Sequence, residues 1–304
     1  MDWFTLRVGW LGDAYKPDRR AIGLFRILYG IALLAFPVHM QWTVDVPRAF
    51  FDPGPGLPGL VPIPPSATYV LILQVLHVVT AVWLVVGWRT RVATGAVVAV
   101  GLLEYSLVYS FGKIDHSILF QLVPVVMVAA GWGASFSLDA RRGRRAEPSG
   151  LPLVSWSVII AFAFATAALA KAAAGWWSPN HYGARSYAVD DLLFGSTTGP
   201  LLGEAVNHLS PLFWKLIDLG TLFAEGWLVI AIISPRLFRA GLVMVLGFHV
   251  SVYLVLGIDF SSYAFVYLPF FLATPRTWFA PSVGWADWKH RFGRADEVTR
   301  SVGT

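Results

Sequence analysis

The chain of 304 residues contains no cysteine, so disulfides, thiolate metal ligands and cysteine nucleophiles are all excluded. Charged residues are also scarce, at 13% of the chain, compared with about 25% in a typical soluble domain. Hydrophobic residues make up 56%, with 14 Trp and 21 Phe. So few charges cannot cover a water-exposed surface of this size. This excludes a soluble enzyme, a disordered protein and a nucleic-acid-binding protein.

The first twenty residues lack the pattern of a secretory signal, which needs a basic stretch, an apolar run and a small-residue cleavage site. Their large apolar side chains are interspersed with polar residues, at Trp3, Phe4, Leu6, Trp10 and Leu11. This composition favours an interfacial N-terminal segment, residues 1–20, that lies on the bilayer surface.

Long apolar runs occupy most of the remaining chain, and a membrane-spanning helix needs about 20 mostly apolar residues. The runs predict an all-α, polytopic membrane helix bundle of about eight transmembrane helices. We expect them at residues 21–38, 67–87, 92–110, 117–133, 153–174, 212–233, 237–257 and 260–274, of which the fourth and the eighth are short. The Pro/Gly-rich loop at residues 39–66 has no helical period.

The distribution of Lys and Arg tests this count of helices. With the N-terminus inside, seventeen of the 23 basic residues fall in cytoplasmic segments, and only Arg48, Lys113 and Arg185 fall in outer loops. The positive-inside rule describes this bias. We therefore expect a multi-pass protein of the cell membrane with both termini in the cytoplasm. Residues 21–275 would form the transmembrane domain and residues 276–304 a basic, aromatic cytoplasmic tail.

Ionisable residues inside the apolar runs are the candidates for function, because each costs at least about 2.5–3.5 kcal/mol to insert. They are Arg26, His77, Glu104, Lys171, Glu225 and His249. In the expected topology, Lys171, His116, His249 and Asp259 share the outer half of the membrane. Burial favours the neutral form of an amine, and a neutral amine is a general base near pH 7. This group predicts a site that deprotonates a phenolic or quinol-type ligand.

Structural interpretations compete with this one at each position. Lys171 is close enough to a helix end to reach the headgroups. His116 follows a helix-capping aspartate and could be only an interfacial hydrogen-bonding group, and His249 could be an interior one. We expect His77 and Glu104 to pair helices, and Arg26 to form a structural ion pair, for example with Glu104. The sequence shows no metal-ligand spacing, phosphate loop, nucleophile elbow or dinucleotide fingerprint, so no metal is predicted.

Five ordered segments carry a resemblance to a known family. They are RAIGLFRILYGIALL at 20–34, FGKIDHSILFQLVPVVM at 111–127, WGASFSLDA at 132–140, LAKAAAGWWSPNHYG at 169–183 and GFHVSVYLVLGIDFSSYAFVYLPFF at 247–271. Together they resemble the HTTM (horizontally transferred transmembrane) domain, the membrane module shared with the vitamin K-dependent gamma-carboxylase. The resemblance extends over about residues 20–275.

The resemblance implies roles for three residues and a cofactor. Lys171 takes the place of the base that acts on vitamin K hydroquinone, His116 supports that site, and His249 matches a later membrane histidine. A reduced naphthoquinone is the implied cofactor. The chain departs from the carboxylase in having only about 30 residues after the last expected helix, and in the Ala-Ala-Ala-Gly stretch after the lysine. Carboxylation of a protein glutamate is therefore disfavoured.

Three functions stay open at this point. The first is a carboxylase-like membrane enzyme that acts on a quinol or lipid-like ligand. The second is a non-catalytic partner in the maturation of a peptide or membrane protein. The third, a transporter, is less favoured because the sequence shows no internal repeat and no matching pair of broken helices.

Overall fold

The computed structural model describes residues 3–61, 63–112, 117–144, 146–194, 202, 205 and 208–272. All regular secondary structure in these ranges is helical. The α-helices are α1 (Trp3–Tyr15), α2 (Arg19–Ala35), α3 (Trp42–Asp45), α4 (Ala67–Val86), α5 (Thr90–Tyr109), α6 (Ile118–Ala129), α7 (Leu138–Arg141), α8 (Leu151–Ala173), α9 (Gly183–Phe194), α11 (Pro211–Ala231), α12 (Pro235–Leu256) and α13 (Tyr263–Tyr267). Three short 3-10 helices complete the set: η1 (Arg48–Phe50), η2 (Pro58–Leu60) and η3 (Leu268–Phe271).

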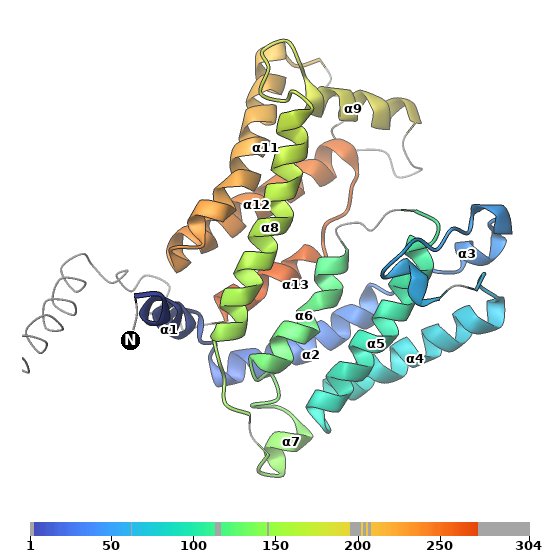
Figure 1. Ribbon diagram of the computed structural model, residues 1–304, viewed down its shortest axis with the longest axis vertical. Helices are drawn as coiled ribbons and strands as arrows, with labels where there is room; N and C mark the ends of the chain where they lie inside the picture. Colours follow the sequence, from blue (N-terminus) through green and yellow to red (C-terminus); the bar gives the residue numbers. More distant parts are fainter. Residues whose placement is uncertain are drawn as a thin grey trace, which may run out of the picture.

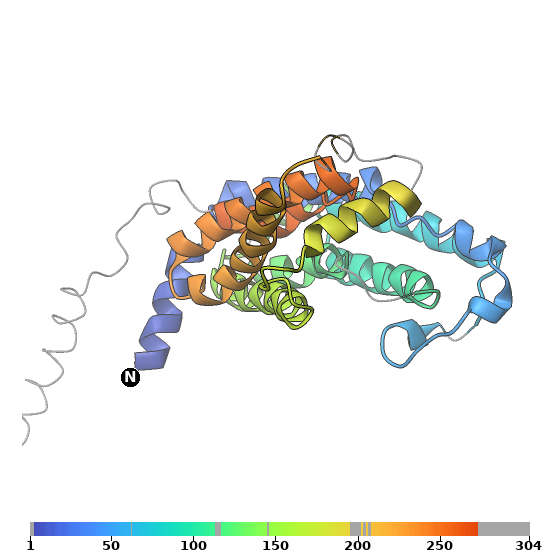
Figure 2. The same cartoon turned by 90° about the horizontal axis from the view of Figure 1, so that it is seen from above.

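The long helices form two packed groups (Figure 1). In the first group, α2 packs on α4, α4 on α5, and α5 on α6; in the second, α8 and α12 pack on α11. Helix α6 contacts both α8 and α13 and so joins the groups. Helix α1 packs against α8 and α12, and it lies at the opposite end of the molecule from α4 and α5 when seen from above (Figure 2).

Four helices are long and apolar enough to cross a membrane: α4, α5, α8 and α12. Their outward faces carry large apolar side chains, such as Leu71, Val75 and Val79 on α4, which suit lipid contact. Helix α6 is apolar but has only 12 residues, α2 has 17 residues, and α11 carries three charged residues. The described part of the chain thus has the helical membrane character expected from the sequence.

The last expected helix, at residues 260–274, is not one continuous α-helix in its described part, which ends at residue 272. The chain instead forms the five-residue α13 and then the 3-10 helix η3, which has Pro269 in its first turn. Proline has no backbone N–H to donate to the preceding helical turn. The loop at 39–66 also contains the short elements α3, η1 and η2, and α9 lies between the expected helices at 153–174 and 212–233.

The broken α13–η3 segment lies inside the bundle. Tyr263, Val266, Tyr267 and Phe270 are buried, and the Trp156 indole of α8 donates a hydrogen bond of 3.2 Å to the Val266 carbonyl. Short irregular backbone in a membrane domain is tolerated where protein surrounds it.

The two ends of the described bundle are joined. The backbone N–H of Asp18, just before α2, donates to the Leu272 carbonyl at 2.9 Å. Arg239 of α12 donates to the carbonyls of Phe270 and Ala14, at 2.8 and 3.1 Å. The beginning of the chain and its last described segment therefore share one set of hydrogen bonds.

Arg26 has a different role from the one expected. Its side chain is fully buried and donates to the carbonyls of Leu84, 3.1 Å away on α4, and Phe136, 2.7 Å away. The expected partner, Glu104, instead hydrogen-bonds His77 Nδ1 at 2.9 Å, and His77 Nε2 lies 2.9 Å from the Leu33 carbonyl. The His77–Glu104 pair thus connects α2, α4 and α5, and Arg26 fixes the end of α4 to the 133–137 loop.

Asp139 of α7 caps the start of α5. Its carboxylate accepts hydrogen bonds from the backbone N–H groups of Arg89 and Thr90, at 2.9 and 2.6 Å, and from the Thr90 hydroxyl at 2.9 Å. Burial alone would raise the pKa of Asp139. The hydrogen bonds from Thr90 and Arg89 lower it, as does the charge of Arg144, and the net pKa is below its ordinary value.

We expect Asp139→Ala to destabilise the protein by about 1–2 kcal/mol at neutral pH, because it removes this cap. A carboxyl group whose pKa is depressed by folding stabilises the native state above its unfolded-state pKa. That contribution disappears as the pH falls through the folded-state pKa. Thermal unfolding in detergent should therefore show a wild-type advantage at pH 7 that shrinks in acid. An equal difference at both pH values would contradict this account of the cap.

Candidate functional site

An ion pair joins α8 and α11, which pack against each other in the second group. Lys171 Nζ, near the end of α8, lies 2.5 Å from Glu225 Oε1 on α11. The Glu225 side chain is 4% exposed and that of Lys171 is 25% exposed. Lys171 Nζ also lies 5.7 Å from the centre of the Trp176 ring. The buried, neutral amine expected from the sequence is therefore replaced by a partly exposed amine whose carboxylate partner is Glu225.

The turn after α8 is held over this pair by α11. Lys215 Nζ donates to the Trp176 carbonyl at 2.9 Å and to the carbonyl of His181, and it lies 3.0 Å from Asp218 Oδ2. The fully buried Asp218 carboxylate accepts from the Gly183 and Ala184 backbone N–H groups, at 3.2 and 2.8 Å.

Asp218 thereby caps the start of α9 and fixes residues 174–183 beside Lys171. Asp218 was not identified from the sequence, because the capping role of an aspartate within an apolar run becomes evident only once its hydrogen-bond partners are known.

His249 of α12 lies among aromatic rings rather than at the amine. Its ring stacks on Phe260, with centroids 4.2 Å apart, and meets Tyr263 edge-on at 4.9 Å. It also stacks at 6.0 Å on Phe164, which precedes Lys171 by seven residues on α8. Seven residues are two helical turns, or about 10 Å along the axis. His249 thus contributes to an aromatic wall on the same side of α8 as the ion pair.

Tyr267 of α13 connects the aromatic wall to the ion pair. Its ring centroid lies 6.0 Å from that of His249. Both Tyr267 Oη and Glu225 Oε2 are buried atoms without a hydrogen-bond partner among the described residues. Buried polar groups are nearly always satisfied, so these two atoms are candidates for hydrogen bonds to a further group.

Two residues of this site were given no role from the sequence. Glu225 was among the candidate ionisable residues but was not assigned as a partner, although a lysine in an apolar helix requires a partner of this kind. Tyr267 gave no signal, since a tyrosine in an aromatic run is ordinary core composition. His116 lies outside the described residues, so its predicted role stays a prediction. Asp259 is exposed and accepts hydrogen bonds from the Ser261 N–H and hydroxyl, at 2.7 and 3.1 Å.

Two cavities are defined elsewhere on the described surface. One, of about 400 Å³, lies between the start of α2 and the 133–137 loop, and the other, of about 560 Å³, lies along α9. Neither is lined by Lys171, Glu225 or His249. Among the residues that the structure describes, no three His, Asp or Glu side chains come close enough to hold a metal ion.

Comparison with known proteins gives one match. A model of the HTTM domain matches residues 15–278, which includes every helix from α2 to α13 and the whole Lys171 site. No curated protein and no solved structure matches the chain. The helical membrane character, the ordered motifs and this match agree, and the chain belongs to the HTTM domain family.

Proposed function

We propose that this protein is a multi-pass membrane enzyme that removes a proton from a quinol or lipid-like hydroxyl ligand at the Lys171–Glu225 pair. The observation that carries the proposal is the ion pair itself, with a 4% exposed carboxylate in a helix that is otherwise apolar around it. Such a charge costs free energy within a membrane and is rarely present without a function.

The proposed topology has eight membrane segments, of which the last, α13–η3, is short, and it has both termini in the cytoplasm. It rests on the charge distribution of the sequence and on the positions of the long apolar helices. In this topology α8 runs outward, so Lys171, in its last turn, lies near the outer surface. A ligand dissolved in the outer leaflet would reach the site from the side.

A reduced naphthoquinone fits the chemistry of this site. It is a flat, apolar ring system with two phenolic hydroxyls, and it supplies reducing electrons when bound. Tyr267 Oη and Glu225 Oε2 are free to hydrogen-bond a hydroxyl, and the rings around His249 offer apolar surface. Lys171 accepts the hydroxyl proton once its own proton has passed to Glu225. His116 is proposed to support the amine.

Quinone retention and oxygen uptake test this function. We expect the purified wild-type protein to retain a naphthoquinone and to consume oxygen when supplied with the reduced form. General-base catalysis contributes about 10²–10⁴-fold to a rate, so Lys171→Ala should lower the rate by at least about a hundredfold. The matched control is Lys16→Ala, an exposed lysine outside the site, which should behave as wild type. Wild-type protein that neither binds the quinone nor takes up oxygen would exclude the proposal.

A non-catalytic role in peptide or membrane-protein maturation is the second candidate. The cavity of about 560 Å³ along α9 favours it, since Leu193 is exposed there with Arg185 and Asp190 beside it. A photo-crosslinking residue at Leu193 should then capture one defined partner in native membranes, and Lys171→Ala should leave that product unchanged. Absence of a crosslinked product would count against this role.

A further inference from the structure

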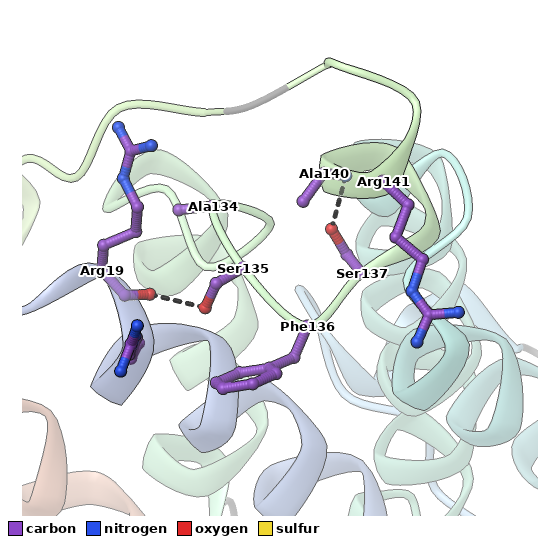
Figure 3. A pocket seen from close by; sticks show the side chains of 8 residues that line it. Arg19, Ala134, Ser135, Phe136, Ser137, Ala140 and Arg141 are labelled. Atoms are coloured by element: carbon purple, nitrogen blue, oxygen red, sulfur yellow. Dashed lines mark hydrogen bonds between the residues drawn. The ribbon is translucent and has the colours of Figure 1, made fainter.

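The smaller cavity lies at the start of α2, far along the chain from the Lys171 site. It has a volume of about 400 Å³ and is lined by residues of α2, the 133–137 loop and α7: Arg19, Arg20, Ala134, Ser135, Phe136, Ser137, Ala140 and Arg141. Figure 3 shows Arg19 and Arg141 on opposite sides of the loop, with Ser135 and Ser137 between them. Small-molecule sites usually have volumes of about 300–1,000 Å³.

The loop that forms the cavity floor is fixed by hydrogen bonds. Ser135 Oγ donates to the Arg19 carbonyl at 2.7 Å, and Ser137 Oγ donates to the Gly133 carbonyl at 2.8 Å while it accepts from Ala140 N at 2.9 Å. A Cβ atom at Gly23 of α2 would lie 2.2 Å from Ser135 Oγ, so the close approach of loop and helix requires glycine there. The cavity is therefore a built feature and not a gap between loose segments.

Phe136 occupies an unusual conformation in this loop. Its φ angle of 52° is in the left-handed region, which is uncommon for a bulky residue and costs about 1–3 kcal/mol. Its carbonyl accepts from the buried Arg26, and its side chain is 57% exposed. The strained backbone thus places a large apolar ring at the edge of a basic cavity.

Three arginines give the cavity its charge. Arg19 pairs with Glu147 at 2.5 Å, and both side chains are exposed to solvent, at 38% and 77%. Exposed pairs of this kind contribute little to stability, so an incoming anion can replace Glu147. Among the described residues, neither Arg20 nor Arg141 forms an ion pair. The nearby carboxylates of Asp18 and Asp139 are already engaged in capping α2 and α5.

We propose that this cavity binds the phosphate group of an anionic phospholipid. Guanidinium groups match phosphate oxygens in geometry as well as charge. Arg19, Arg20 and Arg141 would surround the headgroup, and the exposed Phe136 ring would contact the acyl chains. In the proposed topology these arginines lie on the cytoplasmic side, where anionic lipids attract basic residues near a membrane surface.

Native mass spectrometry of the purified full chain tests the site. The protein is incubated in detergent with phosphatidylglycerol, with phosphatidylcholine or with inorganic phosphate. The test variant is Arg19→Gln/Arg20→Gln/Arg141→Gln. The matched control is Arg48→Gln/Arg91→Gln/Arg142→Gln, which removes three exposed arginines that do not line the cavity. Circular dichroism verifies that each variant keeps its helical content.

We expect wild type and control to retain phosphatidylglycerol in preference to phosphatidylcholine, and the test variant to retain at least about tenfold less of it, since each basic residue near a membrane surface contributes about 1 kcal/mol. Should the triple variant not fold, Arg141→Gln alone should lower retention several-fold. Equal losses in test and control variants would overturn the proposal, because general charge would then explain binding. So would equal retention of the two lipids. Thermal stabilisation by inorganic phosphate without retention of phosphatidylglycerol would overturn the lipid assignment in favour of a soluble anion.

Discussion

Lys171→Met is expected to destabilise the protein by about 3 kcal/mol or more. The substitution leaves the buried carboxylate of Glu225 without its partner, and breaking a buried ion pair from one side typically costs about 3–5 kcal/mol. Glu225→Leu should cost less, because the Lys171 side chain is 25% exposed and its amine can turn to water. Thermal unfolding in detergent measures both changes, with Lys16→Met as the matched control.

The double variant Lys171→Met/Glu225→Leu should recover most of the stability lost by Lys171→Met. Replacing both members of a buried ion pair with apolar residues of similar size is often neutral or stabilising. Quinol-dependent oxygen uptake should nevertheless be absent from the double variant. A stable but inactive double variant would separate the chemical role of the pair from its structural one. If the double variant were as unstable as Lys171→Met, the pair would not be the cause of the instability.

Gly87→Ala is expected to destabilise the protein by more than about 4 kcal/mol. Losses of stability this large are typical of substitutions that disrupt core packing or a buried hydrogen-bond network. Gly87 ends α4 with a φ angle of 69°, which alone costs an alanine about 1–2 kcal/mol. An added Cβ would also lie 1.7 Å from Arg26 Nη1 and 2.6 Å from Ser137 Cβ. Arg26 cannot move aside without losing its hydrogen bonds to the Leu84 and Phe136 carbonyls.

Gly143→Ala provides the matched control for this substitution. Gly143 has a φ angle of 77°, yet nothing lies within 4 Å of the position its Cβ would take. It should show only the backbone strain, which is common to both sites. Similar losses of thermal stability for the two variants would contradict the close packing of Arg26 against Gly87.

The positions of the long helices could be predicted from the sequence because a long hydrophobic run directly indicates a helix that contacts lipid or the protein core. The expected ranges 67–87, 92–110 and 153–174 agree with α4, α5 and α8 to within two residues at each end. The prediction of a long helix failed where a single residue mattered more than the overall composition of the segment. Pro269, in the aromatic run after α12, is such a residue. It also missed α9, whose start depends on Asp218, 34 residues or more along the chain.

The candidate site was only partly foreseeable. Lys171 was identified because a lysine in an apolar run requires an explanation. Its pairing with Glu225 depends on the relative rotation of α8 and α11, which hydrophobic periodicity in one helix does not specify. Arg26 shows the same limit. Its hydrogen-bond acceptors are backbone carbonyls, which every residue has, so the residue types cannot reveal them.

The hydrogen bonds between Asp18 and Leu272, and from Arg239 to Phe270 and Ala14, have a consequence for biogenesis. The contacts of α1 and of the start of α2 become complete only after the ribosome has made the segment around residue 272. Helices α1 and α2 therefore enter the membrane before the segment that they bind has been synthesised. A nascent chain that stalls before this segment would leave these contacts unformed and would expose the surfaces to quality-control proteases.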